Sequence, residues 1–105
     1  MNNSERKCIL RLTETKINDQ YQGIVAYIGY TDSITGFTKA DERDFSNLLD
    51  KGENAKAYLV DLLKSEGWNL INEYIENPLT GVSSASQPDI IEVVIYVLIF
   101  SPLNP

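Results

Sequence analysis

The chain has 105 residues, and its 15 acidic side chains outnumber its 9 basic ones, which gives a formal net charge of −6 at pH 7. This length suits one domain, 1–105, and the hydrophobic fraction of 43% is enough for a packed core. The acidic balance argues against nucleic-acid binding, which needs an excess of Lys and Arg beside the phosphates. The absence of histidine excludes imidazole catalysis and imidazole-ligated metals.

Targeting and membrane signals are missing from the sequence. Residues 1–7 are polar and lack the apolar core of a signal peptide, and we expect residues 1–6 to be flexible. The longest apolar stretch runs from Ile90 to Phe100 and is interrupted only by Glu92. It is shorter than the roughly 20 residues that a membrane-spanning helix needs. Cys8 has no partner for an internal disulfide. We therefore expect a cytoplasmic protein that does not enter a membrane.

The N-terminal third predicts an antiparallel hairpin. Residues 7–16 alternate between apolar and polar after Ile9, which is the period of a half-buried strand. Asn18-Asp19 supplies a turn, since both side chains can bond their own backbone. A second strand is expected at about 21–31.

Two helices are predicted next. After a turn at 32–33 and a brief extension of the sheet at 34–38, Phe45, Leu48 and Leu49 have helical spacing behind an acidic first turn, so a helix is expected from 41 to Gly52. A second helix follows from Ala55 to residue 66, with an apolar stripe and a glycine stop at Gly67. One bent helix over 41–66, kinked at Gly52, is the alternative.

The C-terminal third predicts a second hairpin. A third strand is expected at 68–75, then a mobile hairpin loop at 77–88, then a fourth strand from about Asp89 to Ser101 that Pro102 ends. The predicted fold class is α+β, with a four-stranded, mainly antiparallel sheet. Its order is β-hairpin, two helices, β-hairpin, and both helices cover the same face.

The fourth strand is apolar on both of its faces, whereas two short helices can cover only one face of a sheet. The second face therefore calls for a partner, and another copy of the chain would bury it. We expect a homo-oligomer, most simply a homodimer. The residues predicted to form its interface are Ile90, Val94, Tyr96, Leu98 and Phe100. A strongly curled sheet, or the 32–40 segment closing that face within one chain, is the alternative.

No residue pattern points to catalysis. Cys8 has no histidine to activate it, and Glu73 and Glu76 would point to opposite faces of a strand. Glycine-rich phosphate loops, calcium loops and nucleophile elbows are absent from the sequence. We expect no catalytic residues, no metal site, no cofactor and no enzymatic activity.

Aromatic residues are the best candidates for a ligand site, because tyrosine combines apolar area with a hydrogen-bonding tip. The predicted ligand-binding residues are Tyr27, Tyr30, Trp68, Tyr74 and Tyr96. The alternative is that strands simply favour tyrosine.

The run 58–72 contains a Leu-rich helix that closes in Glu66-Gly67-Trp68-x-Leu70 before a strand. In this it resembles small bacterial domains of unknown function, and Leu98-Ile99-Phe100 is similar to the apolar-aromatic end of their late strand. The resemblance covers about residues 55–100. It implies a similar fold there and no activity or site.

The expected function is that of a small, non-enzymatic interaction or regulatory module that works as an oligomer and can bind another protein. A small-ligand binder with an aromatic pocket is one alternative. The other is an acidic inhibitor, of the immunity or anti-defence type, of a basic nucleic-acid-handling protein. The inhibitor finds support in the absence of Lys and Arg after Lys64.

Overall fold

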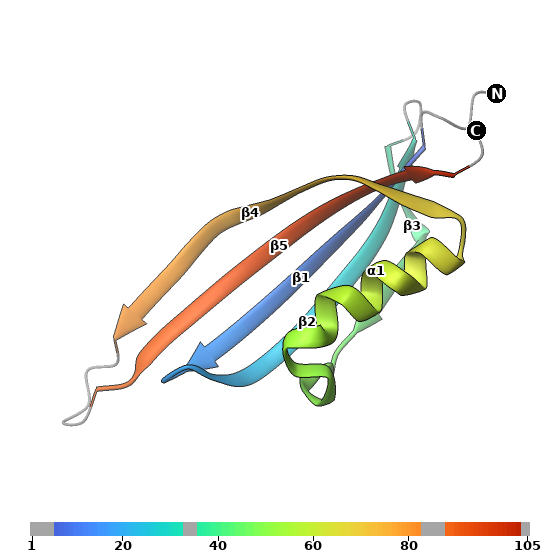
Figure 1. The fold of residues 1–105 in the computed structure, drawn as a ribbon. Helices are drawn as coiled ribbons and strands as arrows, with labels where there is room; N and C mark the ends of the chain where they lie inside the picture. Colours follow the sequence, from blue (N-terminus) through green and yellow to red (C-terminus); the bar gives the residue numbers. More distant parts are fainter. Residues whose placement is uncertain (1–5, 33–35, 83–87, 104–105) are drawn as a thin grey trace.

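The computed structural model describes residues 6–32, 36–82 and 88–103. These residues form one antiparallel sheet of five strands in the order β3-β2-β1-β5-β4, together with one α-helix and one 3-10 helix (Figure 1). The elements are β1 (Lys7–Ile17), β2 (Gln20–Asp32), β3 (Gly36–Phe45), η2 (Leu49–Asn54), α1 (Ala55–Ser65), β4 (Trp68–Val82) and β5 (Ile90–Pro102). The molecule is elongated, with extents of 60 × 25 × 23 Å.

The first predicted hairpin is confirmed and forms β1 and β2. Its turn places Asn18 and Asp19 at φ values of 52° and 65°, a conformation that these two residue types tolerate better than most. The same turn contacts β5. The Asn18 N–H donates to the carbonyl oxygen of Ile90, and the Ile90 N–H donates to Asn18 Oδ1, each at 2.9 Å. These bonds connect the N-terminal hairpin to the start of the last strand.

An antiparallel α+β fold was expected, but four strands with two helices is wrong. The segment predicted as the end of a short extension and the start of a helix is instead β3, which pairs with β2. The apolar residues with helical spacing serve other purposes. Phe45 pairs with Ala26, and the Leu48 N–H donates to the Ile24 carbonyl at 3.0 Å. Pairing with the edge of β2 gives this segment a row of backbone hydrogen bonds. These bonds stabilise the strand more than the weak helical pattern of its residues stabilises a helix, because tertiary contacts readily override local helix propensity.

The second predicted helix is confirmed as α1, and the single bent helix over 41–66 is wrong. Gly52, at φ 53° and ψ −133°, breaks the helical backbone conformation within η2, just before α1 begins. Gly67, at φ 95°, ends the helical region and leads directly into β4.

β4 is longer than predicted and runs to Val82. Register shifts between Leu70 and Asn72 and between Glu76 and Leu79 mark two bulges. The second bulge contains Pro78, so a residue without an N–H falls where regular pairing is already interrupted. Half of the predicted loop at 77–88 is therefore strand, and its residues 83–87 lie outside the described part of the chain, as do residues 1–5 of the N-terminus expected to be flexible.

Helix α1 lies across one face of the sheet (Figure 1). The side chains between helix and sheet form the core: Cys8, Leu10, Leu12, Ile24, Ala26, Ile28, Leu48, Ala55, Leu59, Leu63, Trp68, Leu98 and Phe100. Within the described residues, no helix has both the length and the apolar character needed to cross a membrane. The helix thus divides the sheet into a covered face and an uncovered one.

Candidate functional site

The uncovered face of the sheet, opposite α1, is the most distinctive surface of the described chain. Strand alternation sends Leu10, Leu12, Leu98 and Phe100 to the covered side, so their neighbours in sequence point the other way. We call this surface the open face. Its central members are Ile9, Arg11, Thr13, Thr15 and Ile17 from β1, paired with Ile99, Val97, Ile95, Val93 and Ile91 from β5.

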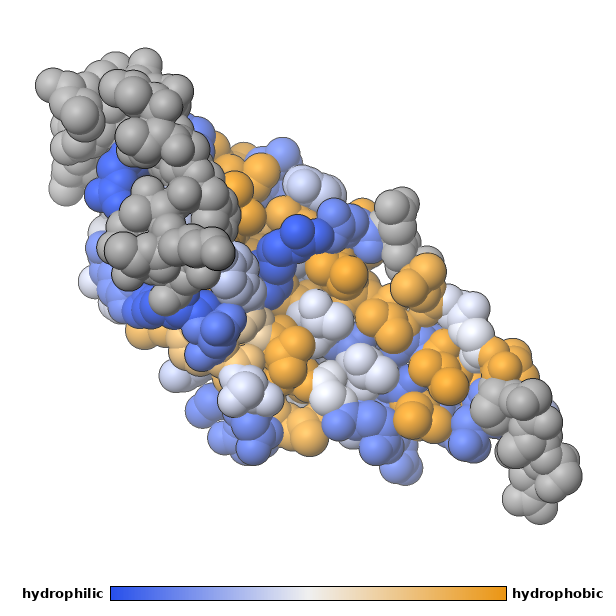
Figure 2. Space-filling view, turned by 180° about the vertical axis from the view of Figure 1, so that it is seen from behind, coloured by the Kyte–Doolittle hydropathy of each residue, from blue (hydrophilic) through white to orange (hydrophobic). Residues whose placement is uncertain are grey.

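The open face is mostly apolar. The five β5 residues form an unbroken aliphatic row, of which Val97 is buried by its neighbours and the other four are half-buried. Three apolar residues elsewhere on the open face are more exposed: Val25 at 44%, Tyr74 at 49% and Leu79 at 63%. Figure 2 shows this side of the molecule, with hydrophobic residues gathered toward the end where β5 begins. Contiguous apolar surface of this kind marks interaction sites more often than ordinary solvent-facing surface.

An ion pair crosses the middle of the open face. Arg11 on β1 donates through Nη2 to Glu76 Oε2 on β4, and the bond spans the β5 row that lies between these strands. The two side chains are 47% and 35% exposed. At that exposure the pair contributes little to the stability of the monomer.

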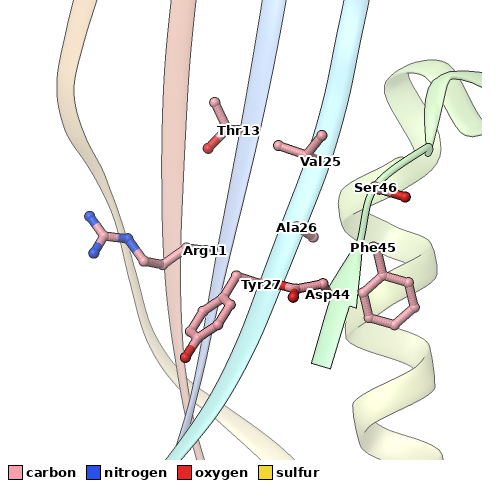
Figure 3. A pocket seen from close by; sticks show the side chains of 8 residues that line it. All are labelled: Arg11, Thr13, Val25, Ala26, Tyr27, Asp44, Phe45 and Ser46. Carbon is pink, nitrogen blue, oxygen red and sulfur yellow. The ribbon is translucent and has the colours of Figure 1, made fainter. Parts of the chain in front are cut away.

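A shallow hollow of about 520 Å³ lies on the β1–β2–β3 side of the open face (Figure 3). It is lined by Arg11, Thr13, Val25, Ala26, Tyr27, Asp44, Phe45 and Ser46. These side chains do not converge on one point. The Arg11 guanidinium extends toward β4, and the Phe45 ring packs against the core. The hollow is therefore continuous with the open face and suits an apolar protrusion better than a ligand that needs several directed hydrogen bonds.

The residues predicted to bind a ligand lie in three separate places. Tyr30 and Trp68 pack against each other on the helix side of the sheet, with ring centroids 5.6 Å apart and ring planes tilted by 39°. Tyr27 lines the hollow on the open face. Tyr96 borders a smaller hollow of about 230 Å³ beside α1, where Lys56 Nζ lies 5.0 Å from the Tyr96 ring centroid. Tyr74, on the edge strand, also lines this hollow, although its pairing with Val97 places its side chain on the open face. The structure does not bring the five residues into one pocket.

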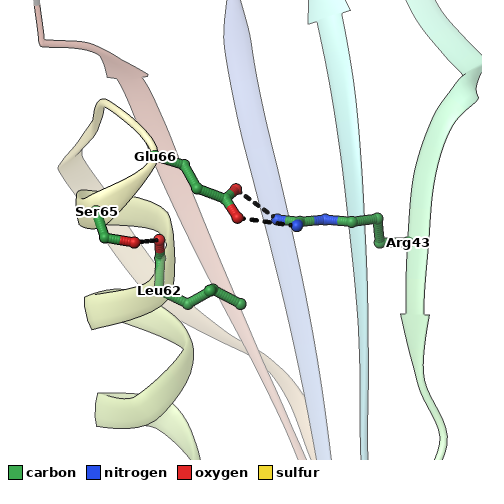
Figure 4. A network of polar contacts seen from close by, with 4 residues as sticks. All are labelled: Arg43, Leu62, Ser65 and Glu66. Atoms are coloured by element: carbon green, nitrogen blue, oxygen red, sulfur yellow. Dashed lines mark hydrogen bonds and ion pairs between the residues drawn. The ribbon is translucent and has the colours of Figure 1, made fainter.

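The Tyr30–Trp68 contact lies beside an ion pair that joins β3 to the end of α1. Arg43 donates through both terminal nitrogens to Glu66, at 3.0 and 2.8 Å (Figure 4). The same end of the helix carries a bond from Ser65 Oγ to the Leu62 carbonyl at 2.6 Å. Burial raises the pKa of the Tyr30 hydroxyl above its usual range, so it stays protonated. These contacts connect β3 to the end of α1, which is a structural role.

Cys8 lies close to the Arg43–Glu66 ion pair and is completely buried. Burial is the main reason that the pKa of its thiol is raised to about 12. The thiol is therefore protonated at neutral pH, whereas a nucleophile needs the thiolate. Within residues 6–32, 36–82 and 88–103, three or more Cys, Asp or Glu side chains do not come together in a way that could hold a metal ion.

The residues predicted to form an oligomer interface all lie on the helix side of β5. Leu98 and Phe100 have no exposed surface, because α1 packs over them. Ile90, at 50% exposure, lies beyond the core at the start of the strand. The sequence shows two apolar faces on this strand, and only the position of α1 decides which one remains open.

Sequence reasoning did not single out Arg11, Glu76 or the opposite row of β5 as a site. Arg11 and Glu76 are 65 positions apart, and a sequence gives no indication that two such residues share a face. The β5 row itself was visible as the other half of an alternating pattern.

Comparisons with models of known protein families, with curated proteins and with solved structures found no match to this chain.

Proposed function

We propose that the protein is a small interaction module that works as a homodimer, with the open faces of two copies packed against each other. One observation carries the proposal: the aliphatic row of β5 lies on the face opposite the chain's single described α-helix. A sheet face that normally meets water alternates with polar residues, and this row does not.

The size of the sheet is sufficient for such a contact. A stable interface buries about 800 Å² on each partner. A molecule 60 Å long and 25 Å wide offers a face of that order. Removing even 500 Å² of apolar surface from water is worth about 12 kcal/mol before the costs of association.

Edge-to-edge pairing through β4 is less favourable than face-to-face packing. β4 is one edge of the sheet, and its two bulges break the regular row of N–H and C=O groups that another strand would need. Face-to-face packing makes no demand on those groups, so the bulges do not oppose it.

The proposal is tested by the oligomeric state of two matched variants of the same strand. V93K places a charge on the open face, and I90K places one on the helix side, where Ile90 is half exposed. Size-exclusion chromatography with light scattering should show a dimer for the wild type and for I90K. V93K should raise the dimer dissociation constant at least tenfold, because a lysine in an apolar contact must be desolvated.

A monomeric wild type at micromolar concentration would overturn the proposal. So would a dimer that I90K disrupts and V93K leaves intact, because the contact would then involve the helix side. Circular dichroism melts of both variants show whether each one is folded.

A further inference from the structure

The Arg11–Glu76 pair occupies a special position on the open face. β1 and β4 are the two neighbours of β5, so the cation and the carboxylate lie on opposite sides of the aliphatic row. Arg11 is level with Val97 in the sheet register, and Glu76 is level with Ile95, two residues further along β5. Both lie near the middle of the length of their strands.

Two-fold symmetry relates these positions in a facing pair of sheets. If the two-fold axis runs along β5, β5 packs over its own copy and β1 of one chain faces β4 of the other. Levels along the strand are preserved, so Arg11 of each copy approaches Glu76 of the other. An axis across the strands at the level of Arg11 would instead set the two arginines against each other.

Packed sheets lie about 10 Å apart, a gap that an arginine and a glutamate reaching from opposite sides can close. We infer that the homodimer, which rests on the proposed function, is aligned by two reciprocal Arg11–Glu76 contacts between the copies, at the level where the ion pair of each chain crosses β5. The four charged groups then form one network in the middle of the contact, and the aliphatic residues of the two β5 rows pack at either end of it.

The aliphatic row supplies the affinity of this dimer, and the charges select its alignment. Burying an ion pair gains little over burying apolar groups, but a misaligned copy would leave like charges in contact. An axis across the strands also stacks β5 on its own copy, so apolar burial does not distinguish the two arrangements and the charges do.

The experiment separates contacts between chains from the contact within each chain. R11E has two carboxylates at the paired positions, and E76R has two cations. In an equimolar mixture the pairs within each chain stay repulsive, while both pairs across the interface become complementary. Native mass spectrometry distinguishes the mixed dimer from either homodimer by mass.

We expect each single variant to weaken self-association at least tenfold and the mixture to form the mixed dimer at least tenfold in excess of the homodimers. The double variant R11E/E76R, which restores every pair, should dimerise like the wild type. If R11E or E76R is unfolded by circular dichroism, R11Q and E76Q replace them. Each of these loses its internal pair, and only their mixed dimer regains one ion pair across the interface.

No preference for the mixed dimer would overturn the inference, because the pair would then act only within one chain. If V93K still dissociates the wild-type dimer in that case, the proposed function stands without this alignment. A monomeric wild type would remove both.

Discussion

Glu14 is the most buried charged residue of the described chain, with 7% of its surface exposed on the helix side of β1. Its neighbours in the sheet are Ile24 and Val94. Burial raises the pKa of its carboxyl group, although the nearby Lys16 and Lys56 act in the opposite direction. The folded protein therefore holds a proton on Glu14 to a higher pH than the unfolded chain does.

This difference in pKa makes the free energy of unfolding depend on pH. Below the ordinary value of 4.5 the group is protonated in both states and has no effect. As the pH rises from 4.5 through the raised pKa, the unfolded state loses its proton first, so stability falls and then stays lower. E14Q removes the cost of ionisation and should be more stable than the wild type at pH 7, with the gain shrinking toward pH 4.

Urea denaturation at pH 7 and pH 4, at one protein concentration, measures this effect. E53Q, which removes an exposed carboxylate from η2, is the control for the loss of one negative charge. A loss of stability for E14Q that is larger at pH 7 than at pH 4 would mean that the two lysines stabilise the ionised form.

At the scale of elements, the junction between α1 and β4 depends on one backbone conformation. Gly67 has φ 95°, its N–H donates to the Lys64 carbonyl at 3.1 Å, and its own carbonyl accepts from Leu103 at 2.8 Å. An L side chain rarely adopts this φ, even though a Cβ at Gly67 would meet nothing within 4 Å.

G67A should therefore lower the free energy of unfolding by about 1 kcal/mol through backbone strain alone. G81A is the matched control, because a Cβ there also meets open space and Gly81 is not among the described glycines with positive φ. Thermal or urea unfolding should show a change within about 0.5 kcal/mol for G81A. Equal effects of the two substitutions would contradict the role of the Gly67 conformation.

The elements that sequence reasoning predicted correctly are those with a strong local pattern and a clear end. The Asn18-Asp19 turn and the Gly67 stop delimit the first hairpin and α1. Only a brief extension of the sheet was predicted at 34–38, and the rest of β3 was predicted as a helix, because its conformation is decided by pairing with β2 and not by a local pattern. The extension of β4 was missed because its bulge at Pro78 resembles a loop in sequence.

At the scale of the whole molecule, the elongated outline distinguishes modes of association. Two copies stacked by their open faces along β5 remain about as long as one copy, near 60 Å, and become thicker. Copies joined end to end would be nearly twice as long.

Small-angle X-ray scattering of the dimer should therefore show a longest dimension close to that of the monomer, with a radius of gyration only moderately above the 16.0 Å of one chain's Cα atoms. V93K at the same concentration supplies the monomer for comparison. A dimer whose longest dimension approaches twice 60 Å would exclude stacking by the open faces.

Composition and local pattern alone determined that the chain lacks imidazole chemistry, contains an antiparallel hairpin and a glycine-ended helix, and carries a last strand with too much apolar surface for one helix layer. These properties depend on residue type and on spacings of two to four positions. Only the tertiary structure decided that α1 covers Leu98 and Phe100, and that Arg11 and Glu76 meet across the opposite row. The two faces of β5 are almost equally hydrophobic in sequence, so burial energy alone does not choose between them. The choice comes from where β3 ends and α1 begins, which is set by hydrogen bonds between residues far apart in the chain.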